Sequence, residues 1–162
     1  MRMMMLAAAA AFVAATPAAA QEATAGTTFT GARIGANVGL ADDDIFGTEM
    51  FTYGVEAGYD ADVGGAVLGA SVEVQDSDDT GRDIAITGRV GAKASPNFLV
   101  YGLAGYTNLK PFSGLKLDGY RVGAGVELGF AEKGFAKIEQ RYSNYELGVD
   151  GFQTVLGVGI RF

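Results

Sequence analysis

The sequence predicts an all-β fold, an eight-stranded antiparallel up-and-down transmembrane β-barrel. Three observations support this prediction. Segments of about ten residues alternate between apolar and small or charged side chains, as strands do when their two faces meet different surroundings. The connections between these segments are alternately short and long. Within the segments, charged side chains fall on one face.

The last segment shows the alternation most clearly, with Phe152, Leu156 and Ile160 on one face and Gln153 and Arg161 on the other. A strand of this length, tilted by about 40°, spans roughly 28 Å, close to the apolar band of a membrane barrel. The predicted strands are Phe29 to Leu40, Phe51 to Asp60, Ala66 to Gln75, Asp83 to Ala94, Phe98 to Thr107, Gly119 to Phe130, Phe135 to Ser143 and Phe152 to Phe162.

Two strands fit the pattern less well. In Phe135 to Ser143, Gln140 is a polar residue on the apolar face. In Phe98 to Thr107 both faces are apolar, so two sets of side chains compete for the outward face. We expect the first set to face outward; the sets are Leu99, Tyr101 and Leu103, and Val100, Ala104 and Tyr106.

The connections support a barrel whose two ends differ. Tight turns of Gly, Asn or Pro are predicted at Asp60 to Gly65, Ala94 to Asn97 and Ala131 to Gly134. Longer loops are predicted at Ala41 to Met50, Asp76 to Arg82, Asn108 to Asp118 and Ser143 to Gly151. Short periplasmic turns and long outer loops are typical of bacterial outer-membrane barrels, which also have an even number of strands.

The energy of exposing charge to lipid assigns the two faces. An Arg or Lys near the bilayer midplane costs about 2 to 4 kcal/mol, so the charged face must point into the barrel. There, seven cations meet four carboxylates, and each needs a partner or water. These lumenal residues are Arg33, Glu56, Glu73, Arg89, Lys93, Arg121, Glu127, Lys137, Glu139, Arg141 and Arg161. A soluble lipocalin-like barrel would have the reverse pattern.

The outward face also carries aromatic residues near the strand ends, as interfacial girdles do. They include Phe51, Tyr59, Tyr120, Phe130, Phe152 and Phe162.

Composition excludes several classes of function. The chain has no Cys and no His, so it lacks thiolate metal sites, disulfides and the usual general base near neutral pH. We therefore expect no cofactor, no metal site and no enzymatic activity. The net charge of -7, without a basic stripe, argues against nucleic-acid binding.

The N-terminal 20 residues predict a cleavable secretory signal peptide. Arg2 is followed by a short apolar run, Pro17 and a small-residue site ending at Ala20. The run is too short to span a membrane as a helix, which needs about 20 apolar residues. The sequence thus divides into a signal peptide at 1–20, a polar leader at 21–28 and a barrel domain at 29–162.

The C-terminus and the penultimate strand carry a family resemblance. The alternating end with Val158, Ile160 and Phe162 resembles the signal by which outer-membrane barrels are recognised for insertion. The run from Glu139 to Tyr145 looks like one found at this position in small barrels of alphaproteobacteria. From Phe29 on, the chain resembles the outer-membrane β-barrel superfamily that includes the OmpA transmembrane domain, OmpX and opacity-type porin-like proteins.

This resemblance implies an outer-membrane location in a Gram-negative bacterium. It also implies contact with outer-membrane lipid and lipopolysaccharide, with the barrel-assembly machinery and with periplasmic chaperones during biogenesis. We expect a monomer. Unlike full-length OmpA, the sequence shows no peptidoglycan-binding domain after Phe162, so we expect no tethering to the cell wall.

Two functions remain open. The first is a structural or surface role carried by acidic outer loops, whose charges either bind divalent cations or merely keep the loops solvated. Those loop charges are Asp42, Asp43, Asp44, Glu49, Asp76, Asp78 and Asp79. The second is a narrow channel gated by rearranging ion pairs, for example Arg89 or Arg121 with Glu73 or Glu127. An eight-stranded interior is just wide enough for side chains to fill, which favours the first function.

Overall fold

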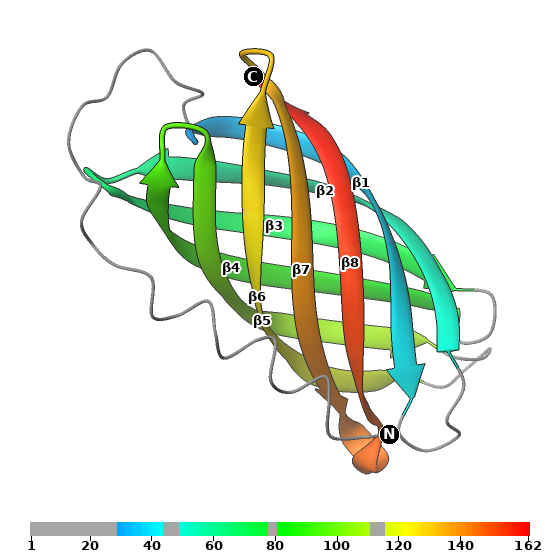
Figure 1. Ribbon diagram of the computed structural model, residues 1–162. Coiled ribbons are helices and arrows are strands. Elements are labelled where there is room, and N and C mark those ends of the chain that lie inside the picture. Colours follow the sequence, from blue (N-terminus) through cyan, green and yellow to red (C-terminus); the bar gives the residue numbers. More distant parts are fainter. Residues whose placement is uncertain (1–28, 44–48, 78–80, 111–115) are drawn as a thin grey trace, which may run out of the picture.

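The computed structural model describes residues 29–43, 49–77, 81–110 and 116–162, in which the chain forms eight strands and one short 3-10 helix. The labels follow Figure 1. The elements are β1 (Gly31–Asp43), β2 (Glu49–Asp62), β3 (Ala66–Ser77), β4 (Arg82–Ser95), β5 (Phe98–Lys110), β6 (Leu117–Phe130), β7 (Gly134–Tyr145), η1 (Glu146–Gly148) and β8 (Asp150–Arg161).

The strands close into a barrel in which each strand pairs antiparallel with its neighbours in sequence. The closing contact joins β1 to β8, where Ile34 lies opposite Ile160 and Val38 opposite Leu156. Figure 1 shows the strands tilted around a common axis, with the β6–β7 turn at one end and η1 at the other. Closure leaves no unpaired sheet edge, as a bilayer requires. The predicted fold class is confirmed.

The two ends of the barrel differ in their connections. At the turn end, residues 63–65, 96–97 and 131–133 join β2 to β3, β4 to β5 and β6 to β7. At the loop end, the strands run further than the sequence predicted, because ladder pairing continues as far as Asp42 and Glu49. The alternation of short and long connections is confirmed, but the predicted loop bounds are too wide.

Burial alternates along the strands and confirms most of the predicted faces. Along β8, Leu156 and Val158 are 54% and 58% exposed, whereas Val155 between two outward neighbours is 1% exposed. The aromatic residues predicted for the girdles are all exposed on the outer surface. Gln140, the outward polar residue of β7, accepts a hydrogen bond of 2.7 Å from Thr154 Oγ1 on β8. In the described ranges, no helix is long and apolar enough to span a bilayer.

The predicted orientation of β5 is wrong. Leu99, Tyr101 and Leu103 are 0%, 3% and 8% exposed, so they face the interior, and Tyr106 on the other set is 51% exposed. The inward set belongs to a buried apolar cluster with Phe29 and Val67. Because apolar side chains line both sides of β5, its sequence carries no signal that separates lumen from lipid.

Several predictions lie outside the described residues. They are the signal peptide at 1–20, the leader at 21–28, and the acidic loop residues Asp44, Asp78 and Asp79.

Candidate functional site in the barrel interior

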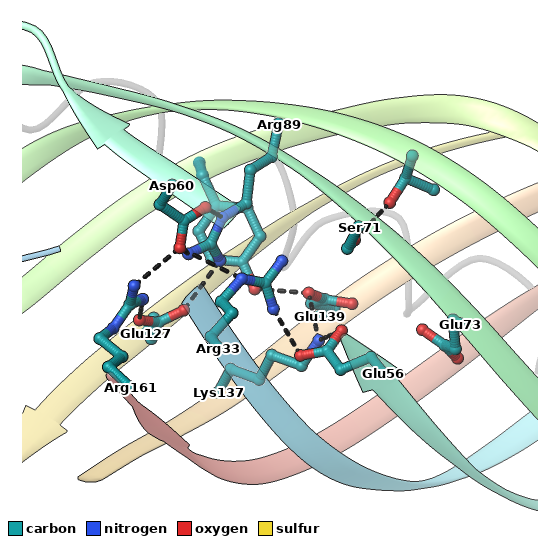
Figure 2. A network of polar contacts seen from close by, with 12 residues as sticks. Arg33, Glu56, Asp60, Ser71, Glu73, Arg89, Glu127, Lys137, Glu139 and Arg161 are labelled. Carbon is teal, nitrogen blue, oxygen red and sulfur yellow. Dashed lines mark hydrogen bonds and ion pairs between the residues drawn. The ribbon is translucent and has the colours of Figure 1, made fainter. Parts of the chain in front are cut away.

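Asp60 lies at the centre of the buried charges, at the inner surface of β2. Its Oδ2 is 3.1 Å from Arg33 Nε, 2.6 Å from Arg89 Nη2 and 2.7 Å from Arg161 Nη1. Figure 2 shows the three guanidinium groups reaching it from different strands. Because the side chain of Asp60 is completely buried, this carboxylate has no water to replace a lost cation.

Arg33 continues the contacts across the lumen. Its Nη1 lies 2.6 Å from Glu56 Oε1, and the other oxygen of Glu56 accepts a bond of 2.7 Å from Lys137 Nζ. Lys137 also donates to Glu139 Oε1 at 3.0 Å. These contacts join β1, β2 and β7, which hold the side chains from different parts of the barrel wall.

Arg141 extends the same path to β3. Its Nε donates to Glu139 at 2.7 Å, and its two terminal nitrogens bind Glu73 at 2.9 and 2.8 Å. This two-pronged geometry is the strong form of an arginine–carboxylate pair.

Aromatic side chains pack among these charges. The guanidinium carbon of Arg161 lies 5.5 Å from the ring centre of Phe29 and 5.3 Å from that of Phe135. Arg89 lies 4.8 Å from the ring of Tyr101, whose hydroxyl donates to Glu139 at 2.5 Å. The interior at this level is therefore filled with paired ions and rings.

Ten charged residues form this connected set, which we call the interior ion network. Arg89 and Arg161 both also contact Glu127, which completes it. Five members are cations and five are carboxylates: Arg33, Arg89, Lys137, Arg141 and Arg161, and Glu56, Asp60, Glu73, Glu127 and Glu139. The network is neutral.

A separate buried pair lies nearer the loop end. Arg121 Nη2 contacts Asp83 Oδ2 at 2.5 Å, and Arg121 Nε donates to Ser143 at 2.9 Å. Asp83 also accepts a bond of 2.5 Å from Thr107. Above this pair, a pocket of about 100 Å³ opens toward the loop end, with Asp42, Asp76 and Gln153 among its lining residues.

Lys93 is the predicted lumenal residue that departs from the rest. It pairs with Asp62 at the turn end, where the two side chains are 29% and 30% exposed. The other ten predicted charges are buried in the interior. The structure thus places Lys93 at the rim of the barrel.

The expected excess of three interior cations is wrong. Three carboxylates that the sequence reading left out, Asp60, Asp62 and Asp83, balance it. Asp60 lies on the same strand face as Glu56, and Asp83 on the same face as Arg89, because each pair is separated by an even number of residues. The alternation of the sequence therefore predicts that both aspartates face the interior. Both were missed because they stand at the ends of their predicted strands.

Glycines on the inner face make room for the network. A Cβ placed on Gly69 would overlap Asp60 Oδ1, and one on Gly157 would lie 2.6 Å from Lys137 Cε. Any larger residue at these positions would push a side chain out of its ion pair. The glycines facing the lumen are therefore part of the site.

The predicted insertion signal lies on the outer surface. Val158, Ile160 and Phe162 are 58%, 49% and 68% exposed at the turn end of β8. This placement leaves their role in insertion a prediction.

The chemistry of the interior is that of a filled, neutral core. Each carboxylate of the interior ion network is held by at least two cationic contacts or by one two-pronged arginine. Among the described residues, no group of carboxylates is arranged to bind a metal ion. The arrangement is suited to fixing strands to one another.

Comparisons with known proteins agree with this architecture. The N-terminal β-barrel of OprF from Pseudomonas aeruginosa superimposes with a TM-score of 0.56 and 19% identity, covering 80% of this chain and 97% of that one. Ail, the attachment invasion locus protein of Yersinia pestis, gives 0.57 and 14%, with coverages of 82% and 97%. Neisserial surface protein A gives 0.55 and 14%, with coverages of 81% and 96%.

At these identities the structural likeness establishes the fold. No curated protein sequence matches the chain. The family model described as "Outer membrane protein beta-barrel domain" matches residues 6–162, nearly the whole sequence. The closed barrel, its apolar outer surface and the family match all indicate an outer-membrane location. The chain is a member of the outer membrane protein β-barrel domain family.

Proposed function

We propose that this protein is a closed outer-membrane barrel that acts as a structural and surface-display element, with its loop end facing the cell exterior. The observation that carries the proposal is the interior ion network. It crosses the lumen from β1 to β3 through buried contacts of 2.5 to 3.1 Å. A barrel of eight strands has an interior that side chains fill, so such a network closes the path along the axis.

Energetics support closure over gating. Opening a water path would separate buried pairs such as Arg141 and Glu73, whose side chains are 4% and 7% exposed. Removing one partner of a buried pair typically costs about 3 to 5 kcal/mol, and the network couples many pairs. A channel that opens by thermal fluctuation would need several of these buried ion pairs to separate at the same time.

The remaining expectations complete the proposal. The protein would be exported by its signal peptide, guided by periplasmic chaperones, inserted by the barrel-assembly machinery and kept as a monomer among outer-membrane lipid and lipopolysaccharide. It would have no enzymatic activity and no cofactor, because the interior carboxylates are engaged in ion pairs. Ail and the Neisserial protein carry names that refer to attachment and to the surface, which agrees with surface display.

The acidic loop end is the candidate for a surface contact. Asp42 and Asp76 are exposed there, and Asp150 is half-buried. We infer that these carboxylates keep the loop end of the barrel hydrated and form the surface that partners outside the cell would contact. A divalent cation among them would be a refinement of the same role.

Recordings in planar bilayers test closure. Refolded protein at high salt should give no stepwise current, whereas stable steps would favour a channel. The pocket above Arg121 and Asp83 makes a channel the second candidate, because it already reaches into the lumen from the loop end. Substituting Asp83→Asn should leave the membrane silent if the interior ion network below it closes the barrel.

Labelling of intact cells tests display. The chain has no native Cys, so single cysteines are unambiguous probes. Asp76→Cys at the loop end should react with a membrane-impermeant maleimide, and Lys133→Cys at the turn end should react only after the outer membrane is opened. Reversed labelling would overturn the proposed orientation.

A further inference from the structure

The cations outside the barrel interior are unevenly distributed. The chain has 12 Lys and Arg residues, of which Arg2 lies outside the described part. Seven others pair with carboxylates in the interior or at the turn-end rim. Lys133 is exposed in a turn. The remaining three lie together at the loop end: Arg82, Lys110 and Lys116.

These three residues form a row across neighbouring strands, which we call the cationic row. Arg82 and Lys110 are directly opposite in the pairing of β4 with β5. Lys116 precedes Leu117, the partner of Leu109 in the pairing of β5 with β6, so it lies beside Lys110. Neighbouring strands are about 4.8 Å apart, which brings the three charges within reach of one ligand.

The cationic row faces outward. Asp83 and Leu117 are 5% exposed and point into the barrel, so the adjacent Arg82 and Lys116 point away from it. Lys110 follows Thr107, an inward residue with 0% exposure, by three positions and so has the opposite orientation. The row therefore meets the surroundings of the barrel and not its pocket.

Like charges directly opposite in a sheet destabilise it, so an unoccupied row is unfavourable. Among the described residues, no carboxylate forms an ion pair with any of its members. Asp118, on the same face, interacts electrostatically with Lys116, but its carboxylate accepts hydrogen bonds from Tyr106 and Asn108. Among the described residues, the three cations of the row thus face one such carboxylate, so the row keeps an excess of positive charge.

The depth of the cationic row indicates its ligand. Tyr106 and Tyr120 lie directly opposite each other and are 51% and 53% exposed, as interfacial girdle residues are. The Asn108 and Asp118 pair follows, and the cationic row lies two residues further. Each step of two residues rises about 7 Å along a strand, so the row stands roughly one headgroup layer above the aromatic residues.

We propose that the cationic row binds the phosphate groups of the glycolipid in the outer leaflet, with Arg82, Lys110 and Lys116 as the binding residues. The inference rests on the proposed function, in which the loop end faces the cell exterior. Phosphate is the acceptor suited to a cluster of guanidinium and ammonium groups. A membrane lipid is the source that an outward, girdle-flanked position favours.

Binding to defined lipids tests the proposal. Refolded protein in uncharged detergent would be titrated with diphosphorylated lipid A, with its dephosphorylated form and with inorganic pyrophosphate, and bound species counted by native mass spectrometry. Wild type should bind the diphosphorylated lipid and discriminate against the dephosphorylated one. The triple variant R82Q/K110Q/K116Q should bind about 100-fold more weakly.

Matched variants separate charge from fold. The variant R82K/K110R/K116R keeps all three charges and should bind within about threefold of wild type. K133Q removes an exposed cation at the turn end and should leave affinity unchanged. If the triple variant fails to give the compact unboiled band of a folded barrel, the single variant K116Q should still weaken binding about fivefold.

Three outcomes would overturn the proposal. They are equal binding by wild type and the glutamine variants, equal binding of phosphorylated and dephosphorylated lipid, and pyrophosphate competing as strongly as the lipid, which would indicate a site for soluble anions. Failure here is distinct from failure of the proposed function. If Asp76→Cys is labelled from outside the cell but the protein does not distinguish the lipids, only the proposal for the cationic row is rejected. If Asp76→Cys is labelled only from the periplasm, both that proposal and the proposed function are rejected.

Discussion

The interior ion network and the cationic row use the same residue types in opposite ways. Inside, each arginine and the lysine touch at least one carboxylate, and five positive charges meet five negative ones. At the loop end, none of the three cations of the row lies within ion-pair distance of a described carboxylate. Interior charges are thus paired within the fold, whereas in the part of the chain that the structure describes the row keeps an excess of positive charge.

The difference separates stability from recognition. A buried pair is costly to break because its partner is left without water, so the network should control unfolding. An exposed cation is hydrated, and its removal costs the fold little. Substitutions in the two regions should therefore have contrasting effects.

The largest effect is expected for Asp60→Asn. It leaves the shape nearly unchanged but removes the charge that Arg33, Arg89 and Arg161 share. The free energy of unfolding should fall by about 3 to 5 kcal/mol, measured by urea titration in phospholipid vesicles. Asp62→Asn, at the half-exposed pair with Lys93, is the control and should cost less than about 1 kcal/mol. Equal losses would remove the distinction between network and rim.

A smaller effect is expected for Gly69→Ala. The new methyl group would overlap Asp60, which cannot move away while Arg89 holds both of its oxygens. A loss of about 1 to 3 kcal/mol should follow in the same titration. At Gly88, by contrast, the nearest atoms would lie 3.9 Å from an added Cβ. Gly88→Ala should leave stability unchanged, and a comparable loss there would contradict the packing argument.

Tyr101→Phe tests the hydroxyl that joins β5 to the network. Losing the bond to Glu139 should cost about 1.5 kcal/mol, since the acceptor is charged and buried. Tyr106→Phe removes a hydroxyl that bonds Asp118 on the exposed surface. Tyr106→Phe should lower the free energy of unfolding by less than about 0.5 kcal/mol. A larger loss for Tyr106→Phe than for Tyr101→Phe would indicate that Tyr101 faces lipid.

The smallest effect on stability is expected for R82Q/K110Q/K116Q. Removing like charges that face each other across strands should change the free energy of unfolding by less than about 1 kcal/mol. Because the substitution relieves repulsion, any change should be an increase in stability. Urea titration in vesicles without lipopolysaccharide isolates this effect from any ligand. A loss as large as that of Asp60→Asn would show that the cationic row supports the fold.

The sequence predicted the fold because alternation is strong wherever one face meets lipid and the other meets charge. In β8, Leu156 and Arg161 leave no doubt about which face each occupies. In β5 the rule failed, because Leu99 and Tyr101 pack into an apolar layer of the lumen. An apolar side chain is compatible with lipid and with a dry interior, so period alone cannot distinguish them.

The site was predicted in composition but not in connectivity. Alternation placed Glu56, Arg89 and Arg141 in the interior, and the structure places them there. It could not show that Arg141 crosses the lumen to Glu73, because such partners lie 68 residues apart and depend on strand register around the whole barrel. The cationic row was missed for the same reason, since its residues come together only through pairing.

The most direct test of the account uses tryptophan, which the native chain lacks. Leu103 is buried in the lumen and its neighbour Ala104 is exposed, so single substitutions to Trp place one probe on each face. In vesicles whose lipids carry bromine on the acyl chains, fluorescence of Ala104→Trp should be strongly quenched and that of Leu103→Trp preserved. Quenching of Leu103→Trp with Ala104→Trp spared would mean that the charged face looks toward lipid, and the account would fail.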